Sequence, residues 1–374
     1  MNVLTNYMSN SRVLKKLDNT DYKYVKNLRG LTSIDSGTGV TLNDSHLSST
    51  LYDLGYYMKR VQERSGIPLP FWPWMRENVV IPPSIARNVD VILARDLLPV
   101  QLRSDVPVVY ETAFVPNDYV GASNYADRRE EIEHELHKIH RFDTYILKTE
   151  ESVERFVEAV NAVTGESVRD AVHHVPYFLP KIGAIGPDAL DEKFSELRPI
   201  RILFVGSDGS RKGVHNLVEA LNRIYAEHPD LRSAFEVMIV TRTDLPRCNF
   251  DVDTHDYLPR EDVIEAFRRA HIFCMPTLKD SYGLVYVEAM ASGCAVVADN
   301  SPVRREILDD GRAGLLSDPE DPDNIAEKLT SLIRSPDRAC ALAERARDRF
   351  QRRYHWRHTG EQYLTVLEKA ASAS

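Results

Sequence analysis

Two adjacent cations, Arg211 and Lys212, stand where an expected strand gives way to an expected helix. Residues 206–213 read Gly-Ser-Asp-Gly-Ser-Arg-Lys-Gly, so the charged pair lies in a glycine loop. A helix N-terminus favours anions through its free backbone N–H groups and its dipole, and two cations there would complete a site for a diphosphate. The loop is neither a Walker A sequence nor GxGxxG. It therefore predicts a phosphate site of another kind, with a pair of solvated cations as the alternative.

A second polar segment, residues 280–293, follows another expected strand and places carboxylates around a helix start. Gly283 allows close approach of the backbone to a ligand, and the amides of Leu284 and Val285 can face a phosphate. Glu288 lies one turn further along the same face, where it could accept hydrogen bonds from a ribose diol. The alternative is a solvated helix carboxylate. Because apolar residues flank Glu288 and an unpaired buried charge is costly, the pattern favours a ligand partner.

These two segments resemble motifs of the retaining group 1 (family 4) glycosyltransferases, which include glycogen-synthase-like and sucrose-synthase-like enzymes. The family pattern is an acid, seven residues and a Glu within a Gly-Leu-Val and Glu-Ala-Met-Ala-x-Gly frame, and residues 280–293 follow it closely. The spacing of the glycine loop also matches. The resemblance covers roughly residues 199–320. It implies an α/β protein of the GT-B fold, in which two Rossmann-like doubly wound domains face a central cleft.

The resemblance also implies roles for individual residues. Lys212 resembles the cation that meets the leaving diphosphate, with Arg211 beside it, whereas Asp280 resembles the ligand of the donor sugar and Glu288 the ligand of the ribose. Tyr257-Leu-Pro resembles the segment that lines the base. The further positions expected at the nucleotide are Gly206, Tyr282, Gly283, Leu284, Val285, Thr241, Arg242 and Leu258.

Three positions depart from the family pattern. Asp280 stands where the family usually has the longer Glu, so its contact with sugar hydroxyls is expected to come from a shifted loop or a different sugar. Ser207 stands where the family often has Arg, which leaves Arg211 as the substitute. In residues 111–114 the family frequently has a His near the donor sugar, and Glu111 is expected to take that polar role.

The activity implied is retaining transfer of a hexosyl or related sugar from a nucleotide diphosphate sugar to a hydroxyl acceptor, which is a glycan, a lipid-linked molecule or a small molecule. Lys212, Arg211 and helix amides would stabilise the departing diphosphate, so no metal and no cofactor is expected. His134, His137 and His140 lack the HExxH spacing and are expected on a solvated helix. A catalytically silent subunit that binds nucleotide sugar, and a sugar-nucleotide epimerase or phosphorylase of the same fold, stay open as alternatives.

Alternating strand and helix patterns must position these residues. In a doubly wound sheet, ligands bind beyond the carboxyl ends of the strands, so the loops that carry Lys212 and Asp280 should share one crevice. Strands are expected at residues 202–205, 235–240, 271–275 and 295–298, and helices at 261–269 and 284–292. In the N-terminal half, strands are expected at residues 89–93, 107–110 and 144–147, and a helix at 128–141.

Proline and glycine are frequent in residues 177–197, which predicts a linker between two domains. The expected domains are residues 1–185, on the acceptor side, and residues 186–354, which bind the nucleotide sugar. A C-terminal helix over residues 355–374 is expected to cross back onto the first domain.

The composition limits the remaining possibilities. A chain of 374 residues with 43% hydrophobic and 28% charged residues is globular and long enough for two cores. Its net charge of −9 offers no broad basic surface, so no nucleic-acid partner is expected.

Four cysteines without CxxC spacing, and the lack of a long apolar stretch near the N-terminus, favour the cytoplasm. Peripheral contact with anionic lipid at the inner membrane face would be allowed by the basic residues Lys15, Lys16, Lys23, Lys26 and Arg29, with a solvated surface as the alternative. The sequence does not predict the oligomeric state.

Overall fold

A computed structural model describes residues 2–5, 23–27, 31–35, 41–45, 90–95, 106–112, 144–177, 179, 184–195 and 199–373. The chain divides into two compact units, Met1–Pro180 with Thr359–Ser374, and Lys181–His358. The first boundary thus stands at 180/181, where the sequence predicts 185/186, and the return stands at 358/359, where the sequence predicts 354/355. Within the described ranges, no helix combines the length and the apolar character that are needed to cross a bilayer.

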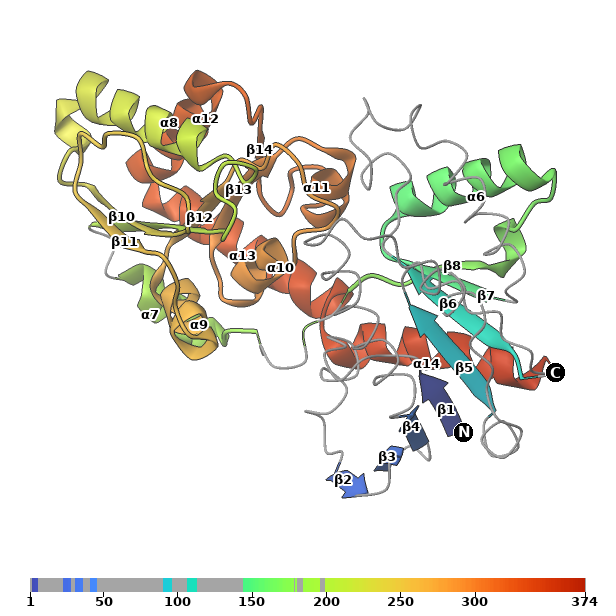
Figure 1. The fold of residues 1–374 in the computed structure, drawn as a ribbon. Helices are drawn as coiled ribbons and strands as arrows, with labels where there is room; N and C mark the ends of the chain where they lie inside the picture. The colour runs from blue at the N-terminus through green and yellow to red at the C-terminus, as the bar shows by residue number, and fades with distance from the viewer. Residues whose placement is uncertain are drawn as a thin grey trace, which may run out of the picture. The chain divides into compact units, whose positions relative to one another are not determined.

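The C-terminal unit is built on a six-stranded parallel sheet with the order β11-β10-β9-β12-β13-β14 (Figure 1). Its strands are β9 (Ile200–Val205), β10 (Phe235–Val240), β11 (Val252–His255), β12 (Ile272–Met275), β13 (Ala295–Asp299) and β14 (Leu315–Ser317). The four expected strands are confirmed, and the two edge strands, β11 and β14, were not expected. The strand order reverses between β9 and β12, which makes their carboxyl ends the place where a doubly wound sheet binds its ligands.

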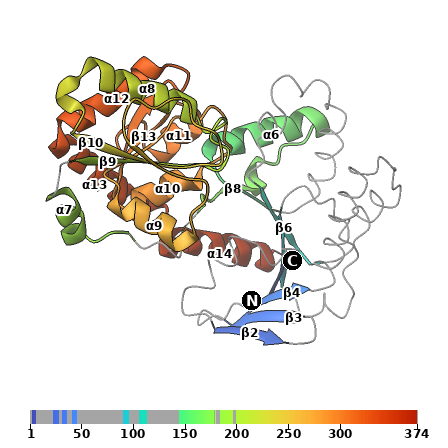
Figure 2. The ribbon, with the colours of Figure 1, turned by 60° about the vertical axis from the view of Figure 1, so that its left-hand side comes forward.

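Helices cover both faces of this sheet. They are α7 (Pro187–Ser195), α8 (Val214–Glu227), η3 (Pro229–Leu231), α9 (Arg260–Arg269), α10 (Leu284–Ala291), α11 (Pro302–Ile307), α12 (Pro322–Arg334) and α13 (Pro336–Arg353). Helices α8 and α12 pack together on one face, whereas α9, α10 and α13 lie on the other (Figures 1 and 2). Val214, Leu217, Val218, Leu221 and Ile224 of α8 are all buried, which confirms the apolar face that their spacing predicts.

The expected linker at residues 177–197 is only partly a linker, because it contains α7. Pro187 is compatible with the first turn of a helix, where its missing N–H is not needed. Leu190 and Phe194 are buried against the unit. Between them Lys193 points inward and donates hydrogen bonds to the carbonyl oxygens of Ser292 and Gly293, both at 2.9 Å. The sequence reading missed this helix because only tertiary contacts show which of its few residues are buried.

The N-terminal unit contains an eight-stranded sheet with the order β2-β3-β4-β1-β5-β6-β7-β8. Its strands are β1 (Asn2–Thr5), β2 (Lys23–Asn27), β3 (Leu31–Asp35), β4 (Thr41–Ser45), β5 (Val91–Arg95), β6 (Val108–Thr112), β7 (Thr144–Leu147) and β8 (Val172–His174). Strands β5, β6 and β7 confirm the three expected ones. All neighbours from β4 to β8 pair in parallel, and β2 and β3 add antiparallel pairs at one edge.

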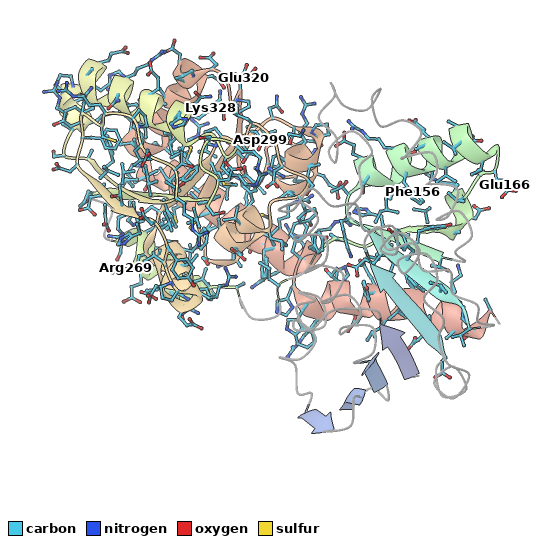
Figure 3. The ribbon with its side chains drawn as sticks, viewed as in Figure 1. Phe156, Glu166, Arg269, Asp299, Glu320 and Lys328 are labelled. Carbon is cyan, nitrogen blue, oxygen red and sulfur yellow. The ribbon has the colours of Figure 1, made fainter. Side chains whose placement is uncertain are left out.

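The helical elements in the described part of this unit are α6 (Glu150–Thr164), the short η2 (Arg169–Ala171) and most of α14 (Trp356–Ser372). Thr149 and Ser152 form a reciprocal capping box at the start of α6. Phe156 of α6 is fully buried, and its ring centroid lies 5.0 Å from that of Tyr145 in β7 (Figure 3). The expected helix at 128–141, with its three histidines, and the lysines at positions 15 and 16 lie outside the described residues.

Candidate functional site

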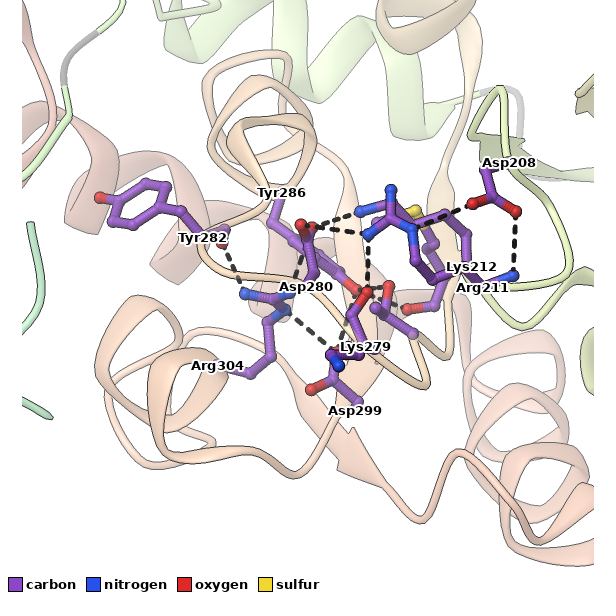
Figure 4. Close-up of polar contacts among 11 residues, drawn as sticks. Asp208, Arg211, Lys212, Lys279, Asp280, Tyr282, Tyr286, Asp299 and Arg304 are labelled. Carbon is purple, nitrogen blue, oxygen red and sulfur yellow. Dashed lines mark hydrogen bonds and ion pairs between the residues drawn. The ribbon is translucent and has the colours of Figure 1, made fainter. Parts of the chain in front are cut away.

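The loops after β9 and β12 meet at the switch point of the C-terminal sheet. Lys212, from the first loop, donates a hydrogen bond to Oδ2 of Asp280, from the second (Figure 4). Both side chains are 13% exposed, so the ion pair is largely shielded from water. The structure therefore brings together the two motifs that the sequence places 68 residues apart.

Glycines shape the first loop. A Cβ added to Gly206 would lie 3.0 Å from Cγ of Lys212, so the lysine stem runs directly over this glycine. Gly213 has a φ of +79° and precedes α8, and a Cβ there would lie 1.8 Å from the carbonyl oxygen of Pro276. Only glycine can adopt that backbone and leave room for the neighbouring chain. The loop is thus held between β9 and the chain that follows β12, and Lys212 is directed at Asp280.

Gly283 shapes the second loop, because it too occupies a backbone conformation and a space that favour glycine. Its φ is +74°, and an added Cβ would lie 2.7 Å from the ring of Tyr286 and 3.0 Å from Oδ2 of Asp280. Helix α10 begins at Leu284, and the amide of Tyr286 bonds back to the Gly283 carbonyl at 3.0 Å. The first turn of a helix has no intrahelical acceptors for its N–H groups, so the amides of Leu284 and Val285 are available for an anion.

Arg211 joins the pair from the exposed side. Its Nη1 lies 3.7 Å from Oδ1 of Asp280, and its side chain is 43% exposed. Two hydrogen bonds also fix the guanidinium: Nε donates to Asp208 at 3.1 Å, and Nη1 donates to the carbonyl oxygen of Lys279 at 2.7 Å. Arg211 therefore has both the charge and the location to act beside Lys212, as its position in the sequence predicts.

Arg304 is a third cation at this site, and the sequence reading missed it. It comes from α11, directly after β13, and its side chain is fully buried. Nε donates to Asp299 at 3.0 Å, Nη1 donates to the carbonyl oxygen of Tyr282 at 2.5 Å, and Nη2 lies 3.4 Å from Oδ2 of Asp280. Its place after a neighbouring strand, at the same carboxyl edge, is the signal that could have identified it.

Burial changes the proton affinities of two groups here. It lowers the pKa of Lys212, and the facing carboxylate of Asp280 opposes that shift. It raises the pKa of Tyr286, whose hydroxyl donates to the Met275 carbonyl oxygen at 2.7 Å. The second group is therefore a neutral structural element, whereas the first is a shielded cation held in place by an anion.

Glu288 has a partner within the protein, contrary to the argument from sequence. Its side chain is 11% exposed, and Oε1 lies 2.6 Å from Nη2 of Arg260, the first residue of α9. The apolar neighbours of Glu288 correctly indicate burial, but burial does not require a ligand partner here, because Arg260 pairs with the charge. Arg260 stands 28 residues earlier, and only the fold brings it to α10.

The other expected nucleotide contacts lie around the same loops. Thr241 is buried after β10, and a Cβ added to Gly209 would lie 2.5 Å from its hydroxyl oxygen. Arg242 is exposed, and its amide donates to the Ser207 carbonyl oxygen at 3.3 Å. Leu258 is half-buried in the segment between β11 and Arg260. Tyr282 is buried and contributes its carbonyl oxygen to Arg304.

Glu111, in the N-terminal unit, is fully buried inside its own domain. Lys148 lies 2.6 Å from one carboxylate oxygen, and the hydroxyl of Tyr363, in α14, donates to the other at 2.8 Å. The expectation that this carboxylate contacts a sugar is therefore wrong in this structure, because β6 lies in the interior of a parallel sheet and its acid is neutralised there. The contact fixes α14 to the first domain.

Comparison with known proteins gives a family match for the C-terminal unit. Residues 199–335 match the model of the family described as Glycosyl transferases group 1. Phosphatidyl-myo-inositol mannosyltransferase of Mycolicibacterium smegmatis is 35% identical over 181 residues, which cover 46% of each chain. D-inositol 3-phosphate glycosyltransferase of Corynebacterium kroppenstedtii is 33% identical over 187 residues, which cover 45% of this chain and 41% of the relative. The chain thus matches about half the length of these relatives.

Solved structures resemble the chain over nearly its full length. A trehalose-6-phosphate synthase, studied for glycosyl transfer with retention, superposes with a TM-score of 0.63 at 14% identity and covers 98% of this chain and 99% of its own. Likeness at this low identity establishes the fold, which is GT-B.

Proposed function

We propose, from the premise that residues 199–335 are a domain of the group 1 glycosyl transferases, that the protein transfers a sugar from a nucleotide diphosphate sugar to a hydroxyl acceptor. The observation that carries the proposal is the ion pair between Lys212 and Asp280 at the sheet's switch point. It stands between the N-termini of α8 and α10, where an anion is favoured from both sides.

The chemistry follows from the charges. As the bond between sugar and diphosphate breaks, negative charge develops on the diphosphate, and Lys212, Arg211 and the first amides of α10 are the donors placed to receive it. Fixed donors of this kind contribute about 3–4 kcal/mol each to the transition state. We propose that these side-chain cations serve in place of a metal ion. Asp280, released by Lys212, would then accept hydrogen bonds from the donor sugar.

The nucleoside is assigned to the other side of α10. Arg260 occupies Oε1 of Glu288, so Oε2 is the oxygen proposed to accept the ribose hydroxyls. The segment with Leu258 and the exposed Tyr257, 67% accessible, precedes Arg260 and is proposed to line the base. Because Arg260 ties this segment to α10, ribose and base contacts would be positioned as one unit.

Retention at the anomeric carbon, the acceptor and the location are further parts of the proposal. Retention is supported by the family motif in residues 280–293. The names of the two relatives include an inositol lipid and an inositol phosphate, which supports a lipid-linked or small hydroxyl acceptor; a glycan is the remaining class. Four free cysteines support a reducing compartment, and we propose a cytoplasmic enzyme with peripheral membrane contact where the acceptor is a lipid.

The experiment is a panel of nucleotide sugars with different bases and sugars. Thermal shift first identifies the donor that binds, and release of free nucleoside diphosphate is then followed with and without candidate acceptors. Acceptor-dependent release confirms a transferase. Binding of a nucleotide sugar without turnover would indicate the silent-subunit alternative, and conversion of the sugar without release would indicate an epimerase. If no nucleotide sugar binds, the proposal is wrong.

A further inference from the structure

Arg304 is held in an environment that a cation rarely occupies. Its side chain is fully buried, and its guanidinium carbon lies 4.3 Å from the centroid of the Tyr286 ring. Asp299 and the carbonyl oxygen of Tyr282 bind Nε and Nη1. These contacts fix the guanidinium plane, so its remaining nitrogen has a defined direction.

That remaining nitrogen, Nη2, is buried and has no hydrogen-bond partner among the described residues. It faces Oδ2 of Asp280 at 3.4 Å, beyond the usual length of a charge-assisted hydrogen bond (Figure 4). A buried charged donor without a hydrogen bond is costly, and such a group calls for an explanation in another state of the molecule. The carboxylate it faces is the obvious acceptor, and the same oxygen already accepts one hydrogen bond.

Lys212 is the group that engages it. Oδ2 of Asp280 accepts the hydrogen bond from Lys212, and Arg304 faces the same oxygen without a hydrogen bond from Nη2. Lys212 is also the cation assigned to the diphosphate. When it turns to a phosphate, Oδ2 loses its partner, and a shift of about 0.6 Å would bring it to the ~2.8 Å typical of a guanidinium–carboxylate bond.

We propose that Arg304 is the alternate partner of Asp280 and takes over its carboxylate when Lys212 moves to the diphosphate. The inference rests on the proposed function and adds a positioning residue to it. Arg304 does not touch the substrate. It keeps Asp280 paired and aimed at the sugar while the lysine serves the leaving group, and its three other contacts hold it in place in the unliganded protein.

The charges around Asp280 decide what happens without Arg304. The groups that face this carboxylate are Lys212, Arg211 and Arg304, while Asp208 neutralises Arg211 and Asp299 neutralises Arg304. The hydroxyl of Tyr286 is bonded to Asp299 at 3.1 Å. With Lys212 on the diphosphate and Arg304 removed, the half-exposed Arg211 is the one cation left beside Asp280 among the residues that the structure describes. Loss of an opposite charge at this distance favours the neutral form of a carboxyl.

Proton uptake on nucleotide binding measures this directly. ADP, GDP and UDP are titrated by calorimetry at pH 5.5 in buffers of different ionisation enthalpy, which gives the number of protons bound with the nucleotide. The test variant combines Arg304→Met with Asp299→Asn, because Asp299 would otherwise be left buried without its cation. Each protein is also measured with Asp280→Asn added. Subtracting the uptake of the Asp280→Asn form from that of its parent removes protons taken up by the phosphate or by other groups.

In the wild type, the Asp280→Asn subtraction should leave no uptake, because Arg304 replaces Lys212 as the cation beside the carboxylate. In the test variant it should leave a measurable uptake of up to about one proton per nucleotide, because loss of the facing cation favours the neutral form of a carboxyl. Arg304→Lys, which keeps the charge, should return uptake towards zero. A merely structural role for Arg304 would weaken the fold without creating an Asp280-dependent proton.

Two results overturn the inference. Nucleotide binding by the folded test variant without uptake would show that Arg304 does not hold Asp280 in the bound state, and the proposed function would stand because the nucleotide binds. If the test variant does not fold, the wild type decides: uptake that disappears with Asp280→Asn contradicts the inference, and its absence supports it. Failure of the wild type to bind any of the three nucleotides would overturn both proposals.

Discussion

Replacing Glu288 by Gln separates the charge of this side chain from its shape. In the unliganded protein the charge is paired with Arg260 at 2.6 Å, but Arg260 is 49% exposed. A pair with one partner this open to solvent contributes only about 0–1 kcal/mol to the free energy of unfolding. Glu288→Gln should therefore fold normally and melt close to the wild type.

Its effect on nucleotide binding should be larger. A hydrogen bond to a charged group contributes about 1.5–3 kcal/mol and one between neutral groups about 0.5–1.5 kcal/mol, so the loss of charge should cost about 1–1.5 kcal/mol of binding. This corresponds to a rise in Kd of about 5- to 13-fold. Because the ribose lies away from the reacting carbon, the rise should be the same for the free nucleoside diphosphate and for the intact donor.

Calorimetry on both ligands provides the assay. Glu265→Gln, an identical change at an exposed position of α9, is the matched control and should leave both affinities unchanged. Asp280→Asn should weaken only the sugar-bearing ligand. It removes the carboxylate assigned to the sugar, and it leaves Lys212 free for the diphosphate. If Glu288→Gln binds the free diphosphate as tightly as the wild type, the ribose assignment is refuted.

Three further outcomes test other parts of the account. EDTA should leave transfer activity largely intact, and loss that magnesium or manganese restores would refute metal independence. Burial lowers the pKa of His271 to about 4 in the folded protein, from an ordinary value of 6.5. As the pH falls, this histidine is therefore protonated in the unfolded chain before it is protonated in the folded protein. Stability should therefore fall as pH decreases from 6.5 to 4, and a urea midpoint that stays flat over this range would argue against it. Tyr363→Phe removes the hydrogen bond to the buried Glu111 carboxylate and should lower the free energy of unfolding by about 1.5–3 kcal/mol. Denaturant titration checks the value, and an unchanged midpoint would exclude a stabilising role for this contact.

The C-terminal domain could be predicted well because local pattern and fold agree there. Strand β10 has the predicted bounds, and the apolar spacing of α8 matches its buried face. Edge strand β11 was missed because only half of its residues are even partly buried, so it lacks an apolar run. Within the candidate site, glycine loops and helix starts are local features, and they placed Lys212 and Asp280 correctly at one edge of the sheet.

The residues that sequence reasoning missed or misjudged depend on distant contacts. Arg260 pairs with an acid 28 residues away, and Arg304 faces Asp280, 24 residues away, besides Asp299, five residues away. Both are ordinary surface types, and nothing local indicates that Arg304 is buried. Glu111 was assigned by its position relative to a family motif, yet Lys148 and Tyr363 neutralise it inside the domain. A charged residue's burial and pairing follow from tertiary structure, which single-sequence patterns do not contain.

The most direct test of the diphosphate site is the turnover of Lys212→Met, measured with the donor that the nucleotide-sugar panel identifies. The substitution keeps most of the stem that packs on Gly206 and removes the charge. Loss of one charged donor should reduce kcat about 10²- to 10³-fold, with a melting temperature close to the wild type. Lys328→Met, at a distant position on α12, should retain full activity. An unchanged rate for folded Lys212→Met would contradict the assignment of this lysine to the leaving diphosphate.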